Sequence, residues 1–243
     1  MGYGHARAVE RLLKSGGAMR GLYVETLVRA DLDRVWELTR DPRLHQRWDL
    51  RFTTIDPVPG TEPQRFRYAT RVLPGLRIGG TGTTVGERTR PDGTRTSALR
   101  FSSGHPLSPI VAGAGYWRYV PSGGGVRFLT GYDYTPRHRV VDRVFRPLMG
   151  WGTAWSFDRL RLWAERGTTP EASLRTTALD VAWRLAATAA VAGFSPPAAL
   201  VAGVAVALIP PSPGTPAARR CLRTPPDRFS ATAPATLARL EQR

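Results

Sequence analysis

About six short runs of alternating apolar and polar residues, between positions 50 and 137, constrain the fold of this chain most. Proline and glycine mark the turns between them, at Pro59-Gly60, Pro74-Gly75, Pro91-Asp92-Gly93 and Ser122-Gly123-Gly124-Gly125. Short runs joined by such turns predict an antiparallel meander. One run contains Gly79, Gly80, Gly82 and Gly86, which predicts a strand that bends sharply. The sequence thus favours a curved sheet.

The last run, residues 126–135, indicates which side of this sheet faces the interior. Alternate residues of a strand share one face. Val126, Phe128, Thr130, Tyr132 and Tyr134 therefore lie together, and we expect this face to point inward. The expected partner strand, residues 114–120, places Trp117 and Tyr119 on the same side.

A long helix is predicted directly after this sheet. Apolar residues recur at three- and four-residue steps from His138 until Gly167, a typical C-terminal stop. Pro147 lies inside this pattern and predicts either a kink or a division into two segments. Before the meander, residues 23–30 alternate as a strand, Asp31 is an N-cap for a helix over 32–39, and residues 43–48 form a second short helix.

This order of elements resembles that of the START-like helix-grip superfamily, also called SRPBCC. Ala30 to Trp36 is similar to the family pattern at the start of its first helix, although Asp31 stands where proline is common. Trp48 and the stretch Gly125-Val126-Arg127-Phe128 continue the resemblance. It implies an α+β helix-grip domain over residues 20–167, with a curved antiparallel sheet of about seven strands around a long C-terminal helix.

Two further stretches are similar to a bacterial branch near the polyketide cyclase/dehydrase and lipid-transport group. They are residues 115–121, and residues 149–151 with 155–163. The resemblance specifies the fold better than the chemistry, because this fold carries many functions. It implies binding of an apolar or aromatic small molecule, lipid- or polyketide-like, in an internal cavity. The alternative is a polyketide cyclase or aromatase that uses the same cavity.

Seven aromatic side chains are predicted to form the cavity wall, since aromatic walls suit flat or apolar ligands. They are Trp117, Tyr119, Phe128, Tyr132, Tyr134, Trp151 and Trp155. The alternative reading is that these side chains only pack the core. Arg118, His105 and Arg100 are candidate polar anchors, although Arg100 alternates away from Leu99 and Phe101 and is expected to face solvent.

No catalytic residue can be named from the sequence, and a cofactor is not expected. The histidines, His5, His45, His105 and His138, are not in metal-ligand spacing. A G-x-S-x-G nucleophile motif is absent, and the glycine run at 79–86 lacks the lysine of a phosphate loop. A non-enzymatic binding protein is therefore favoured over an enzyme.

The net charge of +16 does not by itself indicate nucleic-acid binding. The basic residues are spread along the chain without a basic stripe or a known reader motif. All but one are arginine, which is typical of a GC-rich coding sequence. Cys221 is the single cysteine, so no intrachain disulfide is expected, and the predicted location is cytoplasmic.

The segment after Gly167 is predicted to be an apolar helical hairpin over residues 168–210. Residues 185–209 are 25 residues without a charge, and one continuous helix of that length would span a bilayer at about 37 Å. Ser195-Pro196-Pro197 interrupts this run, which favours two helices that dip into the membrane or lie at its surface. The alternative is that both helices pack on the domain or form a dimer contact.

Both ends of the chain are predicted to lie outside the folded domain. Residues 1–19 form an N-terminal extension, with Met19 as an alternative start of translation. Residues 211–243 are rich in proline and arginine and are expected to be largely disordered, with a short helix at 234–241. Nothing in the sequence indicates the oligomeric state.

Overall fold

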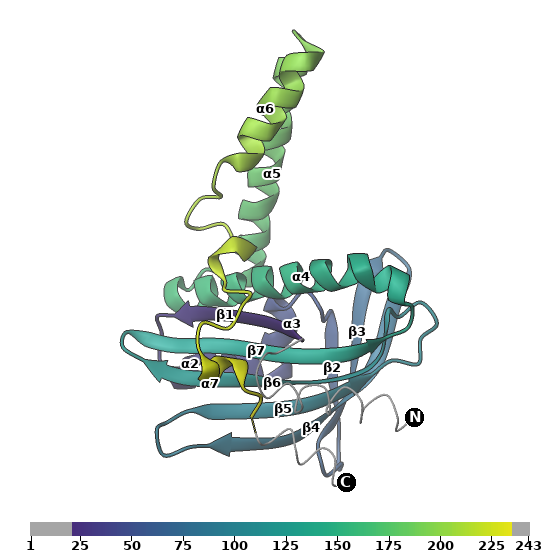
Figure 1. Cartoon of the computed structure of the whole chain (residues 1–243), viewed down its shortest axis with the longest axis vertical. Coiled ribbons are helices and arrows are strands. Elements are labelled where there is room, and N and C mark those ends of the chain that lie inside the picture. The colour runs from purple at the N-terminus through teal and green to yellow at the C-terminus, as the bar shows by residue number, and fades with distance from the viewer. Residues whose placement is uncertain (1–20, 235–243) are drawn as a thin grey trace.

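The computed structural model describes residues 21–234; the N-terminal extension, Met19 and most of the helix expected at 234–241 lie outside this range. Its centre is a seven-stranded antiparallel sheet in the order β1-β7-β6-β5-β4-β3-β2 (Figure 1). The strands are β1 (Leu22–Val28), β2 (Thr54–Val58), β3 (Arg65–Leu73), β4 (Leu76–Thr89), β5 (Arg95–Ser102), β6 (Ile110–Ser122) and β7 (Gly125–Pro136). The meander predicted from the sequence is confirmed as β2 to β7.

The first strand closes the sheet at the opposite edge from β2. β1 pairs with β7, with Leu22 opposite Tyr132 and Val28 opposite Val126. The helices α2 (Leu32–Arg40) and α3 (Pro42–Trp48) follow it. The predicted pairing of the last two strands is confirmed, with Trp117 opposite Thr130 in β6 and β7.

Glycines in β4 make room for aromatic rings from β3. A β-carbon at Gly82 would collide with the ring of Phe66, and one at Gly80 would collide with Tyr68. The pairing of β4 with β5 is also irregular between Thr84 and Gly86. The missing side chains let the two aromatic rings lie across this strand.

The predicted long helix is one continuous element, α4 (Arg139–Arg166), which lies across the sheet in Figure 1. Pro147 is within the helix and does not divide it. A proline removes one backbone hydrogen bond, and the packing of the remaining turns outweighs this loss. Gly167 ends the helix with a φ of 67°, and its N–H donates to the carbonyl of Trp163 at 3.1 Å.

The tightest part of the core lies between β1, β6, β7 and the second half of α4. Phe128 and Phe157 stack with ring centroids 4.5 Å apart. Trp48 from α3 is fully buried beside them, and its indole N–H donates to the carbonyl of Leu38 at 2.9 Å. The two short helices are thereby attached to the sheet and to α4.

Residues 211–234 are not disordered, which corrects the prediction from composition. Leu222 forms an antiparallel bridge with Glu25, with two backbone hydrogen bonds of 2.9 Å. The segment contains the 3₁₀ helix η1 (Ala218–Arg220) and the short helix α7 (Arg228–Ala231). The edge of β1 offers unpaired backbone groups, and this segment satisfies those of Glu25. The composition of a segment does not reveal a partner that is distant in sequence.

Buried polar groups of the domain hold the same segment in place. Arg118 donates to the carbonyls of Phe229 and Thr232 at 2.7 and 2.8 Å. Arg127 forms ion pairs with Glu25 and Asp227 at 2.6 and 3.0 Å. The folded unit therefore includes residues 211–234 as well as the helix-grip domain predicted over 20–167.

Between these two parts, α5 (Pro170–Ala192) and α6 (Pro196–Leu208) form a helical hairpin that stands away from the sheet (Figure 1). Ser195 caps α6, its side chain accepting from the N–H of Ala198. The hairpin does not pack on the domain along its length, contrary to one of the two alternatives. No helix within residues 21–234 combines the length and hydropathy needed to cross a membrane.

Candidate ligand-binding cavity

A cavity of about 740 Å³ lies between the curved part of the sheet, α3 and the first half of α4. Its wall is mostly apolar and comes from β2 to β7 as well as from the helices. The apolar lining residues include Phe52, Ile55, Phe66, Ile78, Leu99, Phe101, Ile110, Phe145 and Met149. A wall of this kind suits a hydrophobic molecule.

The cavity exists because the first half of α4 contacts β7, where Tyr134 donates to Asp142 and Arg146 pairs with Asp133, but leaves a space between itself and strands β3 to β5. Residues from Ala154 onward pack tightly against β1, β6 and β7 in the core. Residues between Val141 and Gly152 instead line the cavity, opposite strands β3 to β5. The far strands curve away from this half of the helix, and the space between them is not filled by side chains.

The seven predicted wall residues fall into two groups, those that line the cavity and those that only pack in the protein interior. Trp117, Tyr132 and Trp151 line the cavity. Tyr119, Phe128 and Trp155 belong to the packed core, and Tyr134 lies in a small cluster with Tyr132 and Ile110. Alternation predicts which face a residue occupies, but not whether the opposite helix is close enough to fill the space.

Three of the lining residues carry basic side chains. One of them, Arg51, forms a buried ion pair with Asp49 next to the cavity. Nε of Arg51 lies 2.9 Å from Oδ1 of Asp49, and Nη2 lies 2.6 Å from Oδ2. Nε2 of His45 is 3.1 Å from the same Oδ2. Arg51 and His45 line the cavity, whereas Asp49 lies behind them.

Burial and charge determine the protonation of this cluster. Burial by itself raises the pKa of Asp49, but the charge of Arg51 and the hydrogen bonds from His45 and Arg51 outweigh it, and the pKa lies below its usual range. Burial lowers the pKa of His45, and Asp49 offsets only part of this effect. At neutral pH the cluster therefore contains one carboxylate, one guanidinium and a neutral imidazole.

Tyr132 extends the cluster to α4. Its hydroxyl is 3.0 Å from Oγ1 of Thr153, and its ring centroid is 5.6 Å from the guanidinium of Arg51. Thr153 donates its own proton to the carbonyl of Met149 at 2.8 Å. Because that proton is used, Tyr132 must be the donor to Thr153. Burial also raises the pKa of Tyr132, which keeps this hydroxyl protonated.

Arg40 is the third basic side chain of the wall. It forms an ion pair with Glu87 and donates to Oγ of Ser97 at 3.3 Å. Glu87 is not among the lining residues. Both arginines of the cavity are thus balanced by a carboxylate that lies outside the lining.

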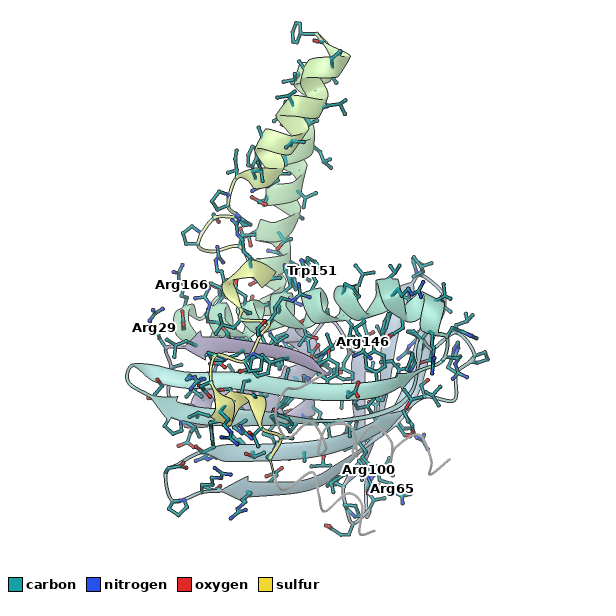
Figure 2. All side chains as sticks on the ribbon, viewed as in Figure 1. Arg29, Arg65, Arg100, Arg146, Trp151 and Arg166 are labelled. Atoms are coloured by element: carbon teal, nitrogen blue, oxygen red, sulfur yellow. The ribbon has the colours of Figure 1, made fainter. Side chains whose placement is uncertain are left out.

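The cavity opens to solvent where lining residues are also exposed. This rim consists of Leu50, Pro57, Gln64, Val72, Leu107, Val141, Leu148 and Trp151. Trp151, labelled on α4 in Figure 2, is 49% exposed. The rim is mostly apolar and has no charged residue, so an apolar molecule can enter without crossing a ring of charges.

The polar anchors suggested by the sequence lie elsewhere. Arg118 is buried on the opposite face of the sheet beneath α7, and Nδ1 of His105 accepts from the N–H of Leu107 within a loop. Arg100 does not line the cavity, although its neighbours Leu99 and Phe101 do. The sequence signal for the observed cluster is the run Trp48 to Phe52, in which charged residues alternate with large apolar ones.

Within residues 21–234, no group of three or more His, Cys, Asp and Glu side chains is arranged to hold a metal ion. The free thiol of Cys221 is buried, and burial raises its pKa to about 12. The polar groups of the cavity wall are the Arg51 cluster, Arg40, Gln64 and scattered hydroxyl groups.

Comparison with curated proteins finds one informative relative. The chain is 46% identical over 168 residues to the uncharacterized membrane protein YndG of Bacillus subtilis, and the match covers 66% of this chain and 63% of that protein. The chain thus spans less than two thirds of that relative's length. No protein-family model matches the chain.

Two solved structures show a limited likeness to this chain. A STAR-related lipid transfer protein from Xanthomonas axonopodis is 18% identical with a TM-score of 0.44, covering 56% of this chain and 81% of that one. The cyclase StfQ (ARO/CYC) from the steffimycin biosynthetic pathway is 12% identical with a TM-score of 0.46, covering 60% and 51%. The predicted architecture is confirmed by the seven-stranded antiparallel sheet and the long helix α4 themselves, rather than by these two likenesses.

Proposed function

We propose that this protein binds an apolar or aromatic small molecule, lipid- or polyketide-like, and works on a membrane to which the α5–α6 hairpin attaches it. The cavity carries the first part of this proposal. Its volume of about 740 Å³ lies within the range of about 300–1,000 Å³ that is usual for small-molecule sites. Its mostly apolar wall and rim favour transfer of a hydrophobic ligand out of water.

The exposed surface of the hairpin supports the second part. Phe194 at its tip is 93% exposed and Leu200 is 76% exposed, and Val201, Val204 and Leu208 are also exposed. No charged residue occurs between Arg184 and Arg219. Soluble monomers rarely expose a contiguous apolar surface of this kind. The relative YndG is named a membrane protein, which agrees with this proposal.

The length of the hairpin favours insertion into one leaflet. The 13 residues of α6 extend about 20 Å, compared with about 30 Å for the hydrocarbon core of a bilayer. Arg184 ends the uncharged part of α5, with an ion pair to Asp180 at 2.8 Å and a hydrogen bond to the carbonyl of Val206. Trp183 lies beside it, as tryptophan often does at a membrane surface.

A cyclase or aromatase acting in the same cavity is the second candidate. His45 and Tyr132 border the cavity and are groups that can transfer protons. Binding is preferred because the proton of Tyr132 is donated to Thr153, and His45, held by Asp49, offers only its second nitrogen, as a proton acceptor. A cyclase would convert a linear polyketide-type chain into a ring, whereas a carrier would release its ligand unchanged.

Native mass spectrometry of the full chain, released from lipid nanodiscs, tests the binding proposal. We expect an added mass on the wild-type protein and its loss in Leu99→Trp, which fills the cavity from its wall. Arg100→Trp is the matched control, because Arg100 is the next residue but does not line the cavity. Equal adducts on wild type and both variants would contradict binding in this cavity.

A further inference from the structure

The Arg51 cluster indicates what the polar end of the ligand should be. Resting on the proposed function, we infer that Arg51 receives a neutral oxygen acceptor of the ligand, such as the carbonyl of a ketone or ester, while the rest of the ligand fills the apolar cavity. The ligand class is then an apolar molecule with a carbonyl group near one end.

The geometry of the guanidinium leaves some of its donors for a ligand. Asp49 occupies the edge formed by Nε and Nη2, at 2.9 and 2.6 Å. The hydroxyl of Tyr132 also accepts a hydrogen bond from Arg51. A guanidinium has five N–H groups in a planar fork, so donors remain for a ligand after Asp49 and Tyr132 are served. Arg51 lines the cavity and its side chain is only 12% exposed, which limits competition from water.

The other polar groups nearby cannot take this role. Tyr132 donates its proton to Thr153, whose own proton goes to Met149. His45 has Asp49 as its partner and can offer only an acceptor from its second nitrogen when it is neutral. Arg51 is therefore the donor in this cluster that a ligand oxygen can use.

Charge balance favours a neutral acceptor over a carboxylate. The positive charge of Arg51 is already matched by Asp49, and that of Arg40 by Glu87. A carboxylate bound at Arg51 would add a second negative charge near Asp49 in a site with little water. Burying an unbalanced charge is costly, whereas a carbonyl only has to exchange a hydrogen bond with water for one with a guanidinium.

Three ligands with the same chain length test this inference. Full-length protein in nanodiscs is loaded with the neutral fluorescent probe 1-aminoanthracene, with empty nanodiscs as the blank, and the probe is displaced by hexadecane, 2-hexadecanone or hexadecanoate. We expect 2-hexadecanone to displace the probe at concentrations about tenfold lower than hexadecane, because a hydrogen bond to a charged group contributes about 1.4 kcal/mol or more. Hexadecanoate should not displace the probe at lower concentrations than 2-hexadecanone does.

The double substitution Asp49→Asn and Arg51→Met removes both charges of the ion pair together, so that no buried charge is left without a partner. This double variant should lose the preference for the ketone and still bind hexadecane as the wild type does. Arg100→Met removes an arginine that does not line the cavity and should keep the preference. Circular dichroism checks that each variant is folded. If the double variant is not folded, the order in which the three ligands displace the probe from the wild-type protein decides the test alone.

The outcomes separate the inference from the proposed function. Equal displacement by hexadecane and 2-hexadecanone, or strongest displacement by hexadecanoate, would overturn the inference and leave binding in the cavity intact. No displacement by any of the three, with probe fluorescence unchanged by Leu99→Trp, would instead count against the cavity as a binding site. A ketone preference that the double variant retains would also overturn the role of Arg51.

Discussion

The carboxylate of Asp158, which is buried on α4, joins this helix to the segment that follows the hairpin. One oxygen accepts from the backbone N–H of Ala217 at 2.8 Å and from Arg220 at 2.9 Å. The other accepts from Nε of Arg161 at 2.7 Å. This one carboxylate therefore accepts hydrogen bonds both from α4 and from the segment after the hairpin.

Replacing this carboxylate should destabilise the protein strongly. We expect Asp158→Ala to lower the free energy of unfolding by about 3–5 kcal/mol, because Arg161 and Arg220 lose a buried partner. Thermal unfolding followed by circular dichroism measures the effect. Glu37→Ala breaks the exposed pair with Arg34 and should cost less than about 1 kcal/mol. A loss for Asp158→Ala no larger than this control would show that the segment after residue 210 does not depend on the carboxylate.

The α5–α6 hairpin differs from the other helices because it does not pack on the domain along its length. Its base is fixed on both sides: Arg47 forms an ion pair with Glu171 at 2.9 Å, and Arg159 donates to the carbonyl of Pro170 at 2.6 Å. Arg220 holds the returning chain through the carbonyls of Pro211 and Ser212. A firmly held base with an exposed apolar tip is suited to insertion into lipid.

Charges on α6 test whether lipid covers this surface. We expect Leu200→Glu with Val204→Glu to abolish flotation of the full chain with liposomes of phosphatidylcholine and phosphatidylglycerol, because charged side chains are costly in the hydrocarbon layer. Val140→Glu is the matched control; this residue is 73% exposed in the first turn of α4, where an acidic side chain is tolerated. Flotation of the hairpin variant at the wild-type level would refute insertion.

In the molecule as a whole, the cavity and the hairpin lie at opposite ends of α4. The cavity lies beneath the first half of α4, whereas the hairpin starts after its last residue, at Pro170. The two chain segments at the base of the hairpin meet, because Oγ1 of Thr176 is 3.5 Å from the carbonyl of Gly214. The hairpin is thus an insertion between two parts of one folded unit.

Removal of the hairpin should separate the two proposed roles. We expect that replacing residues 178–211 with a short glycine-serine linker abolishes flotation with liposomes and leaves the ligand adduct in native mass spectrometry unchanged. The contacts of residues 214–234 with α4 and β1 are kept in this variant. A folded variant that floats normally, or that loses its adduct, would contradict the separation of the two roles.

Much of the architecture could be predicted from the sequence, because it depends on short stretches of chain. Proline and glycine at the turns determined the meander, alternation determined which face of β6 and β7 points inward, and Gly167 determined the end of α4. Ser195 and the prolines after it determined the division of the apolar run into two helices. Each of these signals acts within a few residues, through backbone geometry or a local cap.

The position of the cavity and the ion pairs between charged residues are seen only in the tertiary structure. Tyr119, Phe128 and Trp155 share the inward character of Trp117 but pack in the core, because the second half of α4 fills the space beside them, whereas the first half leaves the cavity open. The order of residues 211–234 depends on β1 and Asp158, which are distant in sequence. Burial and ion pairing depend on distances between segments far apart in the chain, and local patterns contain no information about such distances.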